Sequence, residues 1–243
     1  MAEIEGRPFD YRGAAGGRYL GYLALPERAN GAAVLVAHAA PGLGDHDRAV
    51  ARQLAGLGYV ALAADYHGGG EMIPLAELRP RIDALAADPF MLREALGAAL
   101  AALAAQPGVD GKRIAAIGYC FGGFAALELA RGGADVAAVV GFHSGLPIER
   151  PEEAYNIKGK VLILNGADDP VVPPEKRLAF EAQMNAAGVD WQMHLYGGIQ
   201  HSFTMKGVEK LGLPGMAYDR RADDRSWRAM LDFFGETINP PGT

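Results

Sequence analysis

The sequence is poor in cysteine: its 243 residues include one, Cys120. A single cysteine forms neither an internal disulfide nor a C-x-x-C redox pair. The first thirteen residues hold no apolar segment of signal-peptide length. Because structural disulfides belong mainly to oxidising compartments, we expect a cytoplasmic protein whose thiol is reduced.

Basic clusters and long apolar runs are also missing. The formal net charge is −6, and charged residues make up 21% of the chain. Nucleic acids and anionic membrane surfaces attract basic patches, so neither is an expected partner. No apolar run approaches the roughly 20 residues that a membrane span needs. The hydrophobic fraction of 50% is typical of a globular protein, and without repeats or linkers we expect residues 1–243 to form one domain.

Short apolar runs alternate with segments of helical spacing from residue 32 onward. The expected strands are 19–25, 32–37, 59–63, 113–118, 136–142, 161–165 and 191–196. The expected helices are 45–57, 75–86, 88–105, 124–131, 174–187 and 224–237. Alternation of this kind predicts an α/β fold with a mostly parallel central sheet and helices on both faces.

The stretch 113–131 combines an apolar strand, a glycine-rich turn and a helix around the cysteine. It reads G-x-C-x-G, the spacing of the G-x-S-x-G nucleophile elbow with sulfur in place of oxygen. A sharp turn crowds the residues two positions either side of the nucleophile, and Gly118 and Gly122 have no Cβ to clash. Gly123 would let the helix lie close to the strand, and the helix N-terminus would favour a thiolate at Cys120. The competing interpretation is a buried, inert cysteine beside a glycine-rich turn.

Ligands of open parallel sheets bind beyond the carboxyl ends of the strands. The reactive side chains at those ends are His38, Asp65, Cys120, His143, Asp168, Asp169 and His201. A thiol nucleophile needs a base, and the base needs an orienting group. Cys120, then Asp168 or Asp169, then His201 follow the chain order nucleophile, acid, histidine that this type of elbow uses.

The chain resembles the dienelactone hydrolase family of α/β hydrolases. The matching segments are Val34–His38, Gly58–Leu62, Gly118–Gly123, Gly166–Pro173 and Gly198–Phe203, in family order over about residues 10–238. The resemblance implies an α/β-hydrolase fold that needs no cofactor and no metal. It also implies that Asp169 is the acid and His201 the base, and that the oxyanion hole uses the backbone N–H groups of Ala40 and Phe121.

Two positions depart from the family pattern. Family members commonly carry a glutamate directly after the position of His38, where this chain has Ala39. The family's type enzymes also carry a carboxylate-binding arginine shortly after the H-S-F motif, where Thr204 and Met205 follow here. Residues that could contact substrate are His38, Ala39, Tyr119, His143 and Phe203.

The leading hypothesis is a hydrolase of small carboxylic esters, lactones or thioesters that works through a Cys–His–Asp triad and an acyl-enzyme. The main alternative is a scaffold of the same fold that binds a small ligand without turnover. Two weaker alternatives are a redox-sensing Cys120 and a metal site. The metal site would use His38, Asp45, His46 and Asp47.

Overall fold

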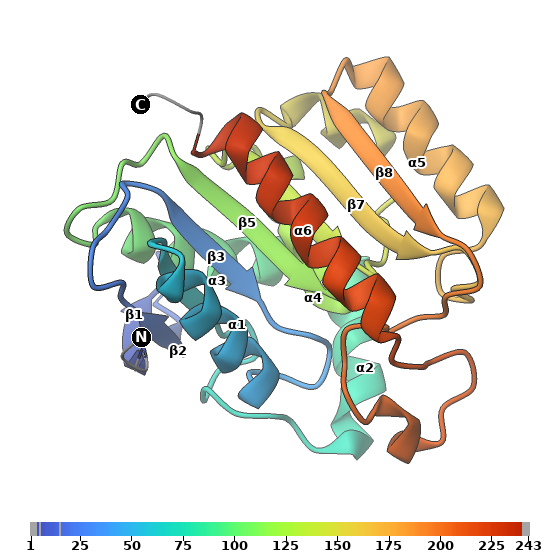
Figure 1. The fold of residues 1–243 in the computed structure, drawn as a ribbon, viewed down its shortest axis with the longest axis horizontal. Coiled ribbons are helices and arrows are strands. Elements are labelled where there is room, and N and C mark those ends of the chain that lie inside the picture. The colour runs from blue at the N-terminus through green and yellow to red at the C-terminus, as the bar shows by residue number, and fades with distance from the viewer. Residues whose placement is uncertain (1–3, 5, 15, 240–243) are drawn as a thin grey trace.

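The computed structural model describes residues 4, 6–14 and 16–239, whose strands form one eight-stranded sheet in the order β1-β2-β4-β3-β5-β6-β7-β8 (Figure 1). The strands are β1 (Gly6–Arg12), β2 (Arg18–Ala24), β3 (Ala33–Ala37), β4 (Val60–Ala64), β5 (Ile114–Tyr119), β6 (Ala138–Phe142), β7 (Lys160–Gly166) and β8 (Trp191–Tyr196). Strands β3 to β8 pair in parallel, whereas β1 and β2 add an antiparallel edge. The predicted mostly parallel sheet is confirmed.

Helices cover both faces of this sheet (Figure 1). They are α1 (Asp45–Gly56), α2 (Leu75–Ala87), α3 (Phe90–Ala104), α4 (Phe121–Arg131), α5 (Pro174–Ala187) and α6 (Arg220–Thr237). Helices α1 and α6 pack on one face, and residues of α2 to α5 belong to the core of the other. The strands β3 to β7 are consequently buried on both faces, which explains their continuous apolar runs.

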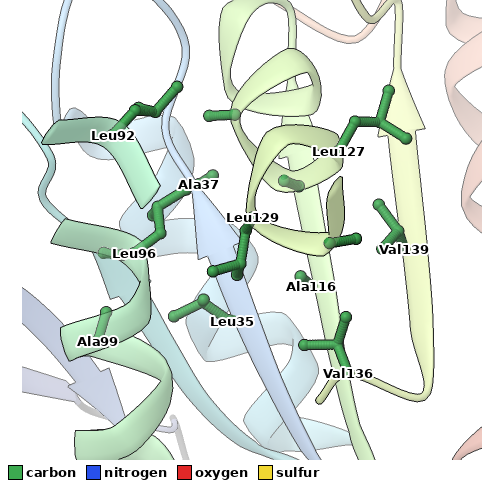
Figure 2. Packing of buried hydrophobic residues seen from close by; sticks show 14 of the residues in the cluster. Leu35, Ala37, Leu92, Leu96, Ala99, Ala116, Leu127, Leu129, Val136 and Val139 are labelled. Atoms are coloured by element: carbon green, nitrogen blue, oxygen red, sulfur yellow. The ribbon is translucent and has the colours of Figure 1, made fainter. Parts of the chain in front are cut away.

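Figure 2 shows the core between the sheet and helices α3 and α4. Leu35 of β3 lies near Leu96 of α3, and Leu129 of α4 fills the space between them and β5. Small residues such as Ala99 and Ala116 belong to the same buried cluster. This packing holds α4 against the sheet, and thereby also holds the turn that precedes the helix.

Four local features differ from the sequence-based expectations. Helix α4 begins at Phe121 rather than at 124, and α6 begins at Arg220, where the Asp219 carboxylate accepts the Ala222 N–H at 2.8 Å. Two 3₁₀ turns, η1 (Pro151–Asn156) and η2 (Val208–Leu211), lie in stretches where no helix or strand was expected. Within the described ranges, every helix falls short of the length and apolarity that a bilayer crossing requires.

Candidate active site

Cys120 stands at the turn between β5 and α4 with a strained backbone. Its φ of 56° and ψ of −118° are rare for a residue with a side chain. A Cβ on Gly118 would collide with the carbonyl of Gly122, and a Cβ on Gly122 would collide with the carbonyls of Ala37 and His38. The two glycines are therefore required by close approach, both within the turn and between the turn and β3.

Three side chains from separate strand-end loops form a hydrogen-bonded row. His201 Nε2 lies 3.1 Å from Cys120 Sγ, and His201 Nδ1 lies 2.7 Å from Asp169 Oδ2. The other carboxylate oxygen of Asp169 accepts the Val171 N–H at 2.8 Å. Asp168, by contrast, is exposed to solvent. Of the two adjacent aspartates, the structure brings Asp169 to the histidine.

The charges in this row stabilise one another. Burial raises the pKa of the Cys120 thiol, but the charge and hydrogen bond of His201 outweigh it, and the pKa of Cys120 is lowered. Burial also opposes the charge on His201, but Cys120 and Asp169 raise the pKa of His201 to about 10. The two opposite shifts favour a thiolate–imidazolium pair over the neutral pair.

Two backbone N–H groups face the sulfur. The amides of Phe121, at the first turn of α4, and of Ala40, in the loop after β3, both contribute to the lowered pKa of Cys120. Donors that favour a thiolate at this point are also placed for negative charge that develops on a neighbouring oxygen. These are the two amides that the family resemblance implies for an oxyanion hole.

Position 39 brings no carboxylate to the sulfur, because Ala39 is a buried alanine. A different carboxyl group, Asp47 of α1, lies behind the same loop and accepts the Gly44 N–H at 2.9 Å. Burial raises the pKa of Asp47 to about 7, and its Oδ1 finds no hydrogen-bond partner within the described part of the chain. Asp47 thereby caps the start of α1 instead of serving as a metal ligand.

The five candidate substrate contacts all lie at 5% exposure or less. They are His38, Ala39, Tyr119, His143 and Phe203. Phe203 packs edge-on against His143, and His143 Nε2 lies 2.8 Å from Thr204 Oγ1. Thr204, one of the two residues that follow the H-S-F motif in place of the family's arginine-bearing segment, is paired to a buried histidine. Their burial favours a supporting role beside the row, and direct contact with substrate stays a prediction.

Sequence reasoning missed His67, which is absent from the reactive side chains expected at the strand ends. The structure half-buries this residue and places its Nε2 2.8 Å from the carbonyl oxygen of Ala40. The available signal was its position at the end of a buried strand, before three glycines.

The conceivable metal site is not formed: across residues 4, 6–14 and 16–239, no group of three or more suitable side chains could hold a metal. Asp45 points to solvent, and His46 packs edge-on against Tyr119.

The mostly parallel sheet, the helices on both faces and the strained strand-to-helix turn at its centre define an α/β-hydrolase fold. The model of the dienelactone hydrolase family matches residues 20–238. The chain therefore belongs to the dienelactone hydrolase family and is a hydrolase.

Individual relatives agree over most of the chain. Carboxymethylenebutenolidase of Pseudomonas sp. (strain P51) is 35% identical over 211 residues, which cover 82% of this chain and 84% of that protein. The solved structure named m3DLH is 45% identical with a TM-score of 0.91, covering 97% of this chain and 99% of that chain. The dienelactone hydrolase-like promiscuous phosphotriesterase P91, from metagenomic libraries, is 42% identical with a TM-score of 0.92 and the same coverage.

Proposed function

We propose that the protein hydrolyses small carboxylic esters, lactones or thioesters, with Cys120 as nucleophile, His201 as base and Asp169 as orienting acid. The observation that carries the proposal is the continuous row from Sγ to Nε2 at 3.1 Å and from Nδ1 to the Asp169 carboxylate at 2.7 Å. A nucleophile, a base and an orienting group within hydrogen-bond reach are what covalent catalysis needs.

The first half of the proposed reaction is acyl transfer to sulfur. The Cys120 thiolate attacks the carbonyl carbon, and the carbonyl electron pair moves to an oxygen held by the N–H groups of Ala40 and Phe121. As the tetrahedral intermediate collapses, the bond to the leaving group breaks. The His201 imidazolium then gives its proton to the departing oxygen or sulfur, which leaves an acyl-enzyme and a neutral imidazole.

Hydrolysis of the acyl-enzyme completes the cycle. Neutral His201 takes a proton from water while the water oxygen attacks the thioester carbonyl, and collapse of this second intermediate expels the thiolate. The product is the carboxylic acid, and the thiolate–imidazolium pair is restored. Throughout, Asp169 holds Nδ1–H, so that Nε2 always faces the reacting atoms.

The surroundings of the sulfur favour uncharged acyl groups. The Tyr66 and Phe121 rings lie 6.1 Å apart, and Phe121 stacks on Phe124 at 5.1 Å. The family's type enzymes carry an arginine shortly after the H-S-F motif. In this chain the motif is followed by Thr204, whose hydroxyl is paired to His143. We therefore place apolar esters and thioesters ahead of substrates that carry a carboxylate.

A second candidate activity is hydrolysis of phosphotriesters. It is favoured by the match to P91, a promiscuous phosphotriesterase that is 42% identical over nearly the whole chain. The same thiolate could attack phosphorus, and the same two N–H groups could hold a phosphoryl oxygen. Paraoxon and p-nitrophenyl acetate release the same chromophore and can be compared directly.

The decisive measurement is p-nitrophenyl acetate turnover by the native protein, by Cys120→Ala and by protein treated with iodoacetamide. We expect turnover to be lost in both altered forms, with unchanged circular dichroism. Alkylation of the resting enzyme should already be fast below the usual thiol pKa of about 8.5. Wild-type turnover in Cys120→Ala would contradict the mechanism, and tight ligand binding without turnover in the native protein would instead indicate a binding scaffold.

A further inference from the structure

The loop after β3 presents two successive carbonyl groups to two histidine rings. The Ala39 carbonyl oxygen lies 2.7 Å from His38 Nδ1, and the Ala40 carbonyl oxygen lies 2.8 Å from His67 Nε2. Because a carbonyl oxygen only accepts hydrogen bonds, each of these ring nitrogens carries the proton. Ala40 is thus held on both sides by histidine donors.

Peptide geometry converts these contacts into control of one N–H group. The C=O of Ala39 and the N–H of Ala40 belong to one planar trans peptide and point in opposite directions. A donor that fixes the Ala39 oxygen therefore aims the Ala40 N–H to the other side, where it faces Cys120. The next peptide ends in Pro41, which has no N–H. The hydrogen bond from His67 to the Ala40 carbonyl oxygen fixes the orientation of that second peptide.

Both histidines are held in the neutral form, with one ring N–H each. His38 is fully buried, and the Tyr66 N–H approaches its Nε2 at 3.4 Å, which leaves Nδ1 as the donor. Burial, and the nearby His67, lower the pKa of His38 to about 3. Burial also lowers the pKa of His67. The two rings lie 4.9 Å apart and stay uncharged at neutral pH.

His67 is itself placed by the segment that follows β4. The buried Asp65 carboxylate accepts the N–H groups of His67, Gly68 and Gly70 at 3.0, 2.9 and 2.9 Å. Arg81 of α2 donates to the carbonyl oxygen of His67 at 2.9 Å. A chain of contacts therefore runs from Asp65 through the His67 ring to Ala40 and on to the sulfur.

We propose that His67 is a positioning residue of the oxyanion hole, which acts together with His38 by holding the carbonyl groups that flank the Ala40 N–H. This inference rests on the proposed esterase function of Cys120. Ala40 is only partly buried, so without His67 water would take over its carbonyl and the loop would be free to turn. The Ala40 N–H would then be less well aimed in the transition state, while substrate binding would change little.

The test compares His67→Ala with His67→Gln, whose side-chain amide can still donate. Removal of a whole oxyanion donor costs about 10²–10³-fold in kcat, so loss of its support should cost roughly 10-fold in His67→Ala. We expect KM for p-nitrophenyl acetate to stay within about 2-fold and His67→Gln to recover most of kcat. The alkylation rate at a pH where the thiol is fully ionised should not change, because attack on iodoacetamide develops no oxyanion.

The matched control is His194→Ala, the same substitution at an exposed histidine of β8. Wild-type kcat in His67→Ala, or equal losses of kcat and of alkylation rate, would overturn the positioning role. Should His67→Ala fold poorly, the same comparison is made between His67→Gln and His67→Asn, whose donor is too short to reach. Failure of the proposed function is distinct, because native turnover would then survive Cys120→Ala whatever happens at position 67.

Discussion

Two adjacent aspartates differ sharply in what they touch. Asp169 is buried and lies 2.7 Å from His201, whereas Asp168 is exposed and contributes its backbone N–H to the Ile199 carbonyl at 3.0 Å. Only the Asp169 carboxylate can hold the histidine tautomer that presents Nε2 to sulfur. The two positions thus form a natural matched pair.

We expect Asp169→Asn to lower kcat for p-nitrophenyl acetate by up to about 10⁴-fold, because an amide that donates to Nδ1 favours the wrong tautomer. Asp168→Asn should stay near the native rate, since its role in the turn is played by the backbone. Steady-state kinetics of both variants, with thermal melts to verify folding, provide the measurement. A larger loss in Asp168→Asn would reassign the acid.

The residues of the row were predictable because spacing and chain order carry them. The G-x-C-x-G turn identifies Cys120, and the strand-end positions identify His201 and two possible aspartates. Spacing alone did not separate Asp168 from Asp169; the family resemblance did, and the structure brings Asp169 to the histidine. The contact of His67 with Ala40 joins residues 27 positions apart in two loops, and no local pattern encodes such a contact.

At the scale of elements, the β5–α4 turn depends on two backbone segments that approach closely. A side chain at Gly118 has no space, because its Cβ would meet the backbone of Gly122 and Gly123. A Cβ added to Gly97, inside α3, would have no heavy atom within 4 Å. The two glycines therefore predict opposite effects of one substitution.

Gly118→Ala should lower the free energy of unfolding by several kcal/mol, or prevent folding, because the turn has to open to admit the methyl group. Gly97→Ala should raise it by about 1 kcal/mol, the usual gain of alanine over glycine in a helix interior. Urea unfolding followed by circular dichroism measures both. A tolerated Gly118→Ala with native turnover would refute the packing argument.

Element boundaries show where local rules fail. The strands β3, β4 and β7 were predicted to within about a residue at each end, because burial on both faces demands an unbroken apolar run. The start of α4 was predicted three residues late. Gly122 and Gly123 are poor helix formers, but a Cβ on Gly122 would meet the carbonyls of Ala37 and His38, and a Cβ on Gly123 would meet the side chain of Ser144.

At the scale of the whole molecule, the class of the sheet was predictable and its strand order was not. Alternating strands and helices imply parallel neighbours, but the order β4-β3-β5 depends on which face each crossover covers. Helix α1 crosses one face between β3 and β4, and α3 lies on the other face before β5. Because the two crossovers cover opposite faces, β5 pairs with β3 on the side away from β4. The ends of β3 and β5 therefore lie together, and with them Ala40 and Cys120.

The buried carboxyl of Asp47 links the stability of the whole molecule to pH. Its pKa is raised from 3.8 to about 7 by burial, so between these values the folded protein binds the proton more tightly than the unfolded chain. The contribution of Asp47 to stability therefore falls as the pH rises from about 4 and levels off above about 7. Each pKa unit corresponds to about 1.4 kcal/mol, so the native protein should lose a few kcal/mol across this range through Asp47.

Asp47→Asn removes the titrating charge and keeps an oxygen to accept the Gly44 N–H. We expect similar urea midpoints for the native protein and the variant at about pH 4.5, and a higher midpoint for the variant at about pH 8, because asparagine has no charge to desolvate. The matched control is Asp45→Asn, on the same helical turn but exposed, which has no burial cost to relieve and should show no gain at the higher pH. A native protein whose midpoint rises steadily from pH 4.5 to pH 8, with Asp47→Asn running parallel to it, would show that Asp47 is charged at no cost and is solvated in the folded state.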